Sequence, residues 1–150
     1  HKDLVIQAGR GNGITAFRVV KRGDKWDTEN VWHNDEVSLH MTNGVVVDGI
    51  LVGLSHLNRG QYFGLELDTG HVVWTGAARQ AENASIVKAG SQVISLQNDA
   101  ELIVLDNIRT EFKPVKNYEV ASSETWSQPV ISGERLFVKD FTTLTLWTVK

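Results

Sequence analysis

The chain contains no cysteine and only two prolines, Pro114 and Pro129, among its 150 residues. The absence of cysteine excludes disulfides and thiolate metal sites, but it assigns no cellular compartment. No more than two basic residues are adjacent and the net charge is −3, so we do not expect a nucleic-acid partner. The apolar runs are only a few residues long, and none of them is long enough to span a bilayer.

Helical periodicity is also missing, because no stretch of about ten residues sustains it. The nearest candidate, residues 77–83, is expected to connect two strand-rich units. The opening His1-Lys2-Asp3 carries neither the charged nor the apolar segment of a secretion signal, although a processed chain would look the same. Thirteen glycines and an abundance of Val, Ile, Thr and aromatic residues favour an all-β fold.

A hairpin unit recurs along the chain. Asp48-Gly49 lies between the apolar runs 45–47 and 50–52, which is a strong hairpin signal. Ala89-Gly90 and Ser132-Gly133 stand in equivalent places, so that the three glycines are 41 and 43 residues apart. A strand-rich unit repeated every 40 to 50 residues or so predicts a β-propeller.

The repeat divides the chain into four units at about 1–32, 33–76, 77–120 and 121–150. The first unit lacks its opening strand and the last lacks its closing strand. We therefore predict a single domain, residues 1–150, that is a β-propeller fragment of about four partly incomplete, four-stranded antiparallel blades. Such an array is expected to be part of a longer ring, or to form a homodimer through exposed blade edges.

The same spacing aligns the tryptophans of the first two units. Nine residues separate Phe17 from Trp26, as they separate Leu65 from Trp74. Trp26 is therefore the expected counterpart of Trp74.

The second unit contains the most complete motif. It places a small residue first, an acid two residues later, then Thr-Gly, then tryptophan four residues after the glycine; these are Gly64, Glu66, Thr69, Gly70 and Trp74. This pattern resembles the tryptophan-docking motif of PQQ-like, quinoprotein-type propeller repeats. The resemblance covers about 30 residues strongly and the rest only through spacing and turns. It implies a structural clamp in which Trp74 stacks on a turn of the neighbouring blade and donates its indole N–H.

The resemblance also implies a function. Some PQQ-like propellers are outer-membrane assembly lipoproteins that bind no quinone, which predicts a non-enzymatic binding scaffold. Its partner would be a protein or a cell-envelope component, its location periplasmic or otherwise extracytoplasmic, and it would need no cofactor. The alternative is a fragment of a PQQ-dependent alcohol or sugar dehydrogenase, which would hold PQQ with Ca²⁺.

Two clusters of polar residues are candidates for a metal site. Asn98, Asp99 and Glu101 carry the oxygen atoms that Ca²⁺ prefers, although Asn and Asp at this place are more typical of a hairpin turn. His33 and His40 flank Asp35-Glu36, where a loop joining two blades is the favoured interpretation.

Aromatic residues outside the motif are candidates for a binding face. Trp32, Trp126 and Gln128, together with Tyr118, fall near expected blade-connecting loops, and Trp126 lies just before an inner strand. Packing between blades is the competing and favoured interpretation for the aromatic residues.

Overall fold

The computed structural model describes residues 1–106 and 108–148, which form four antiparallel sheets. We call these sheets blades 1 to 4 in chain order. Blade 1 has three strands in the order β1 (Leu4–Ala8), β2 (Ile14–Arg22) and β3 (Lys25–Asn34). Blade 2 has four, β4 (Val45–Val47), β5 (Ile50–Ser55), β6 (Gln61–Glu66) and β7 (Val72–Thr75).

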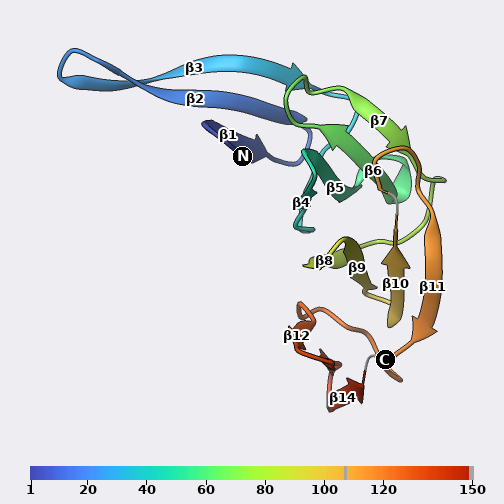
Figure 1. Cartoon of the computed structure of the whole chain (residues 1–150). Helices are drawn as coiled ribbons and strands as arrows, with labels where there is room; N and C mark the ends of the chain where they lie inside the picture. The colour runs from blue at the N-terminus through green and yellow to red at the C-terminus, as the bar shows by residue number, and fades with distance from the viewer. Residues whose placement is uncertain (107, 149–150) are drawn as a thin grey trace.

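Blades 3 and 4 repeat this arrangement. Blade 3 contains β8 (Ala84–Ala89), β9 (Gln92–Gln97), β10 (Glu101–Leu105) and β11 (Pro114–Glu119). Blade 4 contains β12 (Val130–Ser132), β13 (Arg135–Lys139) and β14 (Leu144–Thr148). Every hydrogen-bonded neighbour in these sheets is also a neighbour in sequence, so each blade is a simple meander. Figure 1 shows the four blades following one another along an arc.

The strand pairings show which strand each incomplete blade lacks. In blade 1, β2 and β3 pair as β6 and β7 do, so the described residues include no counterpart of β4 in this blade. In blade 4, β12, β13 and β14 match β4, β5 and β6. The expected homodimer through blade edges stays a prediction, and the mass from light scattering would measure it.

The repeated glycine turns adopt two geometries. In blade 2, Asp48 and Gly49 form the two-residue turn, and both have positive φ, at 50° and 81°. In blades 3 and 4 the pairing shifts the turn by one residue, so that Gly90 and Gly133 come first in it, with φ of 62° and 58°. Glycine adopts such angles without a steric cost, which explains why it marks the repeat.

Blade 1 departs from the expected spacing because its β2–β3 hairpin is long. The hairpin continues to the pair Arg22 and Lys25 and projects beyond the blades (Figure 1). Trp26 stands near its tip with 71% of its surface exposed. The expectation that Trp26 is the counterpart of Trp74 is therefore wrong, because the spacing assumed a hairpin of the same length as in blade 2.

The hydrophobic core lies between blades rather than inside one of them. Ile14 and Val37 pack with Leu51, Phe63, Leu65 and Leu67 between blades 1 and 2. A larger cluster that includes Val52, Tyr62, Trp74 and Ile86 joins blades 2 and 3. Ile94, Leu96, Leu102 and Val120 join Leu136 and Val138 between blades 3 and 4. Because alternate residues of a strand point to opposite faces, Leu51 and Val52 serve different clusters.

Helical structure is confined, within the residues that the structure describes, to the short 3₁₀ turn η1 (Leu57–Arg59). Residues 77–83 connect blades 2 and 3 without forming a helix. The described part of the chain contains no helix with the length and apolar character needed to cross a bilayer.

Candidate functional site

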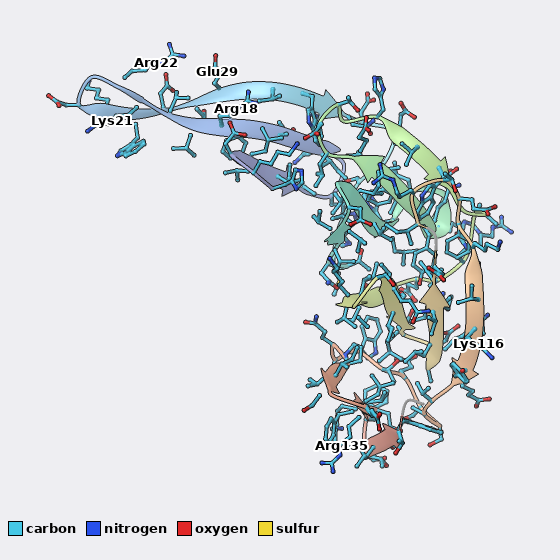
Figure 2. All side chains as sticks on the ribbon, in the orientation of Figure 1. Arg18, Lys21, Arg22, Glu29, Lys116 and Arg135 are labelled. Carbon is cyan, nitrogen blue, oxygen red and sulfur yellow. The ribbon has the colours of Figure 1, made fainter. Side chains whose placement is uncertain are left out.

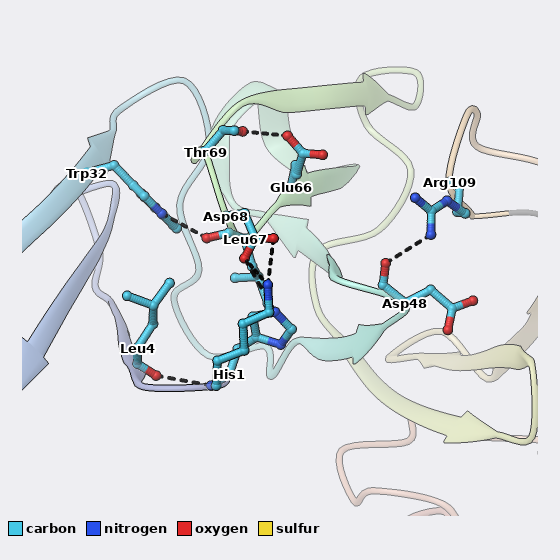
Figure 3. Close-up of polar contacts among 10 residues, drawn as sticks. His1, Leu4, Trp32, Asp48, Glu66, Leu67, Asp68, Thr69 and Arg109 are labelled. Atoms are coloured by element: carbon cyan, nitrogen blue, oxygen red, sulfur yellow. Dashed lines mark hydrogen bonds and ion pairs between the residues drawn. The ribbon is translucent and has the colours of Figure 1, made fainter.

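The β6–β7 turn of blade 2 is built by the motif residues Glu66, Thr69 and Gly70. The Thr69 hydroxyl donates to Glu66 Oε2 over 2.7 Å (Figure 3). The Gly70 N–H donates to the Glu66 carbonyl oxygen over 2.8 Å. Gly70 has a φ of 77°, which disfavours any other residue there. The acid and the threonine therefore shape the turn that the glycine allows.

Trp32 of blade 1 rests on this turn. Its indole N–H donates to the Leu67 carbonyl oxygen over 2.9 Å (Figure 3). A Cβ atom on Gly70 would lie 2.6 Å from the indole, so the missing side chain lets the ring approach the backbone. Asn34 adds a second bond, from its side-chain amide to the Gly70 carbonyl oxygen over 2.9 Å. The structure thus places Trp32 between blades 1 and 2 rather than on an open binding face.

Trp74 makes the corresponding contact with blade 3. Its indole N–H donates to the Ile108 carbonyl oxygen over 2.5 Å, and only 7% of the residue is exposed. Gly64 stands opposite Trp74 in the sheet, and a Cβ atom there would lie 2.3 Å from the ring. Each tryptophan therefore bonds to a backbone carbonyl of the following blade. We call these two contacts the interblade clamps.

The strand register shows where a clamp belongs in each blade. Trp32 pairs with Ala16 and Trp74 pairs with Gly64, in both cases just before a β-bulge. In blade 3 the residue at this place is Lys116, opposite Val104 and next to the corresponding bulge. Blade 3 thus has no tryptophan to donate forward. The small residue opposite the tryptophan, together with the bulge, identifies a clamp that residue spacing alone missed in blade 1.

The candidate Ca²⁺ ligands serve the backbone of a turn. Asn98 Oδ1 accepts the Asn83 N–H over 3.0 Å, and Asp99 Oδ1 accepts the Glu101 N–H over 3.3 Å. Glu101 Oε1 accepts the side-chain amide of Asn117 over 2.8 Å. Within residues 1–106 and 108–148, no three His, Asp or Glu side chains gather as a metal site.

The histidine candidates do not come together either. His33 Nδ1 lies 2.9 Å from the Thr15 hydroxyl, whereas the ring of His40 is tilted against that of His56 with centroids 5.7 Å apart. The buried Nδ1 of His56 has no hydrogen-bond partner in the part of the chain that the structure describes.

Trp126 lines a groove on the face formed by the loops between strands and between blades. The groove encloses about 670 Å³ and extends from the β1–β2 loop to the β11–β12 loop. Thr125 anchors the Trp126 loop, because its hydroxyl donates to the Gln97 carbonyl oxygen over 2.6 Å. Trp126 is 47% exposed and Met41, also in the groove, is 70% exposed. We call this the loop-face groove.

The other candidates for a binding face lie outside this groove. Gln128 is exposed on the loop that follows Trp126. Tyr118 lines a smaller groove of about 420 Å³ between blades 3 and 4, beside Lys116 and Trp147. Sequence reasoning missed the arginines of the loop-face groove, Arg10, Arg59 and Arg79, because they come from three separate loops and form no motif.

A buried polar network lies between blades 2 and 3. The Tyr62 hydroxyl is 2.7 Å from the Ser95 hydroxyl and accepts the Gln97 side-chain amide over 3.2 Å. Burial raises the pKa of Tyr62 to about 12 because the charged phenolate would be desolvated there. The network keeps a polar group neutral inside an interblade core.

Comparison with known proteins supports the fold. No protein-family model matches the sequence, and no curated protein is similar to it in sequence. BamB from Moraxella catarrhalis matches 96% of this chain over 47% of its own length, with a TM-score of 0.63 and 17% identity. The WD40 β-propeller domain of Doa1 matches 97% over 48%, with the same TM-score and identity. A chain of the mitotic checkpoint complex matches 98% over 46%, with a TM-score of 0.73 and 12% identity.

The chain thus spans about half the length of these structures. At such low identity the similarity concerns the fold alone. Together with the four sheets and their meander order, it confirms that this all-β chain is folded as part of a β-propeller.

Proposed function

We propose that this protein is a non-enzymatic binding scaffold that holds a protein partner on its loop face. The observation that carries the proposal is the loop-face groove, where Trp126 and Met41 expose apolar surface beside three arginines. Tryptophan and arginine are the residue types that most often dominate protein–protein binding energy. The interblade clamps support the same role, because they hold the loops of different blades in fixed relative positions.

Two further features support a binding role. Asn98 and Asp99, the best candidates for Ca²⁺, each use a side-chain oxygen to accept a backbone N–H, from Asn83 before β8 and from Glu101 in the same turn respectively. One chain of similar fold was solved within the mitotic checkpoint complex, an assembly of proteins. We further propose an extracytoplasmic location in the cell envelope, which rests on the resemblance of the Gly64 to Trp74 motif to PQQ-like repeats.

The test compares the protein with two tryptophan variants. Trp126→Ala removes an aromatic ring from the groove, and Trp26→Ala removes one from the projecting hairpin as a matched control. Proteins captured from an envelope extract would be identified, purified and bound again to each variant. We expect at least one purified protein to bind the original chain and Trp26→Ala but not Trp126→Ala. Finding none whose binding depends on Trp126 would overturn the proposal.

A second measurement addresses the enzymatic alternative. The protein would be titrated with PQQ and Ca²⁺, followed by absorbance and by a dye-linked alcohol or glucose assay. Saturable PQQ binding together with turnover would replace the scaffold with a quinoprotein dehydrogenase. We expect neither.

A further inference from the structure

The three arginines of the loop-face groove carry guanidinium groups that form no ion pair with a carboxylate of the described residues. Arg10, Arg59 and Arg79 form no ion pair with the residues that the structure describes, although all three line the same groove. On the projecting hairpin, by contrast, Arg18 and Arg22 each pair with an aspartate. The groove therefore brings together three guanidinium groups that no carboxylate of the described residues neutralises by an ion pair.

Two of these arginines are held side by side by the backbone. The Arg79 N–H donates to the Asn58 carbonyl oxygen over 3.1 Å, and the Gln80 N–H donates to the Gly60 carbonyl oxygen over 2.9 Å. These bonds join the β5–β6 loop to the β7–β8 loop. Gly60 packs so tightly that a Cβ atom there would overlap the Ala81 carbonyl oxygen.

The backbone at both arginines is strained. Arg59 has a φ of 60° and Arg79 a φ of 62°, which residues with a Cβ atom rarely adopt. Such conformations persist only where the surroundings impose them, and they cluster at binding and catalytic sites. Side chains reinforce the geometry, since Gln80 Oε1 accepts the Tyr62 N–H over 3.1 Å. The two guanidinium groups are thus projected from a rigid wall, which reduces the entropy lost on binding.

The groove also has an apolar part and a limited negative charge. The Trp126 indole N–H is bonded to Glu124 Oε2 over 2.9 Å, and nearly half of its surface is open. Met41 is exposed in the same groove. Among the residues that line the groove, Glu82 and Asp99 contribute two carboxylates against three guanidinium groups, and the Glu124 carboxylate is occupied by the Trp126 indole outside this lining.

We propose that the loop-face groove binds an extended acidic segment of a protein partner. Carboxylates of the segment pair with Arg59 and Arg79, whose planar groups bind carboxylates through two parallel hydrogen bonds. An apolar side chain of the segment packs on Trp126 and Met41. This inference rests on the proposed function, because it names the kind of partner that the same groove accepts. A nucleic acid fits less well, because the chain as a whole is negatively charged, at −3, and its 18 acidic residues outnumber its 15 basic ones.

The test uses two fluorescein-labelled peptides of the same length, measured by fluorescence anisotropy. One alternates Asp and Glu with Leu and Phe, and the other replaces each acid by Asn or Gln. We expect the acidic peptide to bind, to weaken as salt is raised, and to outcompete its amide counterpart. Equal affinity for the two peptides, or no saturable binding of the acidic one, would overturn the proposal.

Variants assign the binding to the groove. Arg59→Gln and Arg79→Gln remove the charge while leaving a residue with a Cβ atom at each strained position. Each is expected to weaken the acidic peptide about tenfold, as loss of a charge-assisted pair predicts. Arg135→Gln serves as the control, because Arg135 lies in β13 at the far end of the molecule (Figure 2). An equal loss of affinity in Arg135→Gln would show that the peptide responds only to the overall charge of the protein, and it would overturn the assignment to the groove.

Further measurements distinguish a failure of this proposal from a failure of the scaffold proposal on which it rests. Circular dichroism melting of each variant shows whether a loss of binding reflects a loss of folding. A purified partner that requires Trp126 but ignores Arg59 and Arg79 would overturn the acidic segment and leave the scaffold standing. An oligonucleotide that competes as strongly as the acidic peptide would replace the peptide with a general polyanion.

Discussion

The interfaces on the two sides of blade 3 differ in how they are held. Between blades 2 and 3, Trp74 is buried and donates to the Ile108 carbonyl oxygen of the following blade. Between blades 3 and 4, the place of the tryptophan is taken by Lys116, and a groove of about 420 Å³ opens beside it. Trp147 of blade 4 instead donates backwards to the Val120 carbonyl oxygen, over 3.2 Å. The same strand register therefore accompanies a closed interface where it carries tryptophan and an open groove where it carries lysine.

Removing the clamp at the closed interface should have the largest effect. Trp74→Ala is expected to lower the free energy of unfolding by about 3–5 kcal/mol, as other truncations of buried aromatic residues do. Chemical denaturation measures the loss. The clamp would be ruled out by a loss below about 1 kcal/mol, the range of ordinary substitutions away from a core.

The buried Tyr62 should make the same interface sensitive to alkali. Because its pKa is raised from 10.0 to about 12, the neutral hydroxyl stabilises the folded state fully below pH 10. This stabilisation declines from there towards pH 12, by about 3 kcal/mol in all. Denaturation curves between pH 9 and 11 should show the loss in the original chain and a smaller one in Tyr62→Phe. Identical slopes for the two proteins would contradict the assignment.

Gly64→Ala tests how closely the Trp74 ring lies on its strand. The added methyl group would stand 2.3 Å from the ring, so the ring must shift, at a cost of about 1–3 kcal/mol. Blade 1 carries Ala16 at the matching place opposite Trp32. Ala16→Gly is therefore the complementary control, and thermal melting of the two variants compares the two clamps. No change in Gly64→Ala would mean that the ring has room to move.

The smallest effect is expected at the open interface. Lys116→Ala should change the free energy of unfolding by less than about 0.5 kcal/mol, because its side chain is exposed and has no clamp to break. Lys116→Ala, measured by the same chemical denaturation, is therefore the matched control for Trp74→Ala. A loss comparable to that of Trp74→Ala would show that the two interfaces are held alike after all.

Much of the fold could be predicted from the sequence because turn glycines and alternating strands are local signals. Asp48-Gly49 marks a hairpin whatever surrounds it, and the recurrence of such turns indicates an array of blades. The counterpart of Trp74 in blade 1 could not be found in this way. The length of the β2–β3 hairpin depends on strand pairing, which shifted the clamp from Trp26 to Trp32.

The loop-face groove was predictable only in part. Trp126 precedes an inner strand, a position that local sequence reveals, and it does line the groove. Arg59 and Arg79 meet there because two loops exchange backbone hydrogen bonds. Because nearly every residue has the same backbone N–H and C=O groups, the sequence does not reveal which of them will pair. Both arginines have a positive φ, which arginine rarely adopts, so the residue types at 59 and 79 would not predict this backbone conformation.

In both interblade clamps the donor precedes its acceptor in the sequence and is therefore synthesised first. Trp32 donates to a residue 35 positions further along the chain, and Trp74 to one 34 positions further. During synthesis from the N-terminus, Trp32 and Trp74 are therefore added to the chain before their acceptors exist, so the clamps of blades 1 and 2 can close only after the following blade has been made. At synthesis rates of about 5–20 residues per second, this leaves each unpaired indole waiting for a few seconds. Blades 1 and 2 thus stay unclamped until the next blade exists, whereas Trp147 of blade 4 finds its acceptor, the Val120 carbonyl oxygen, already made.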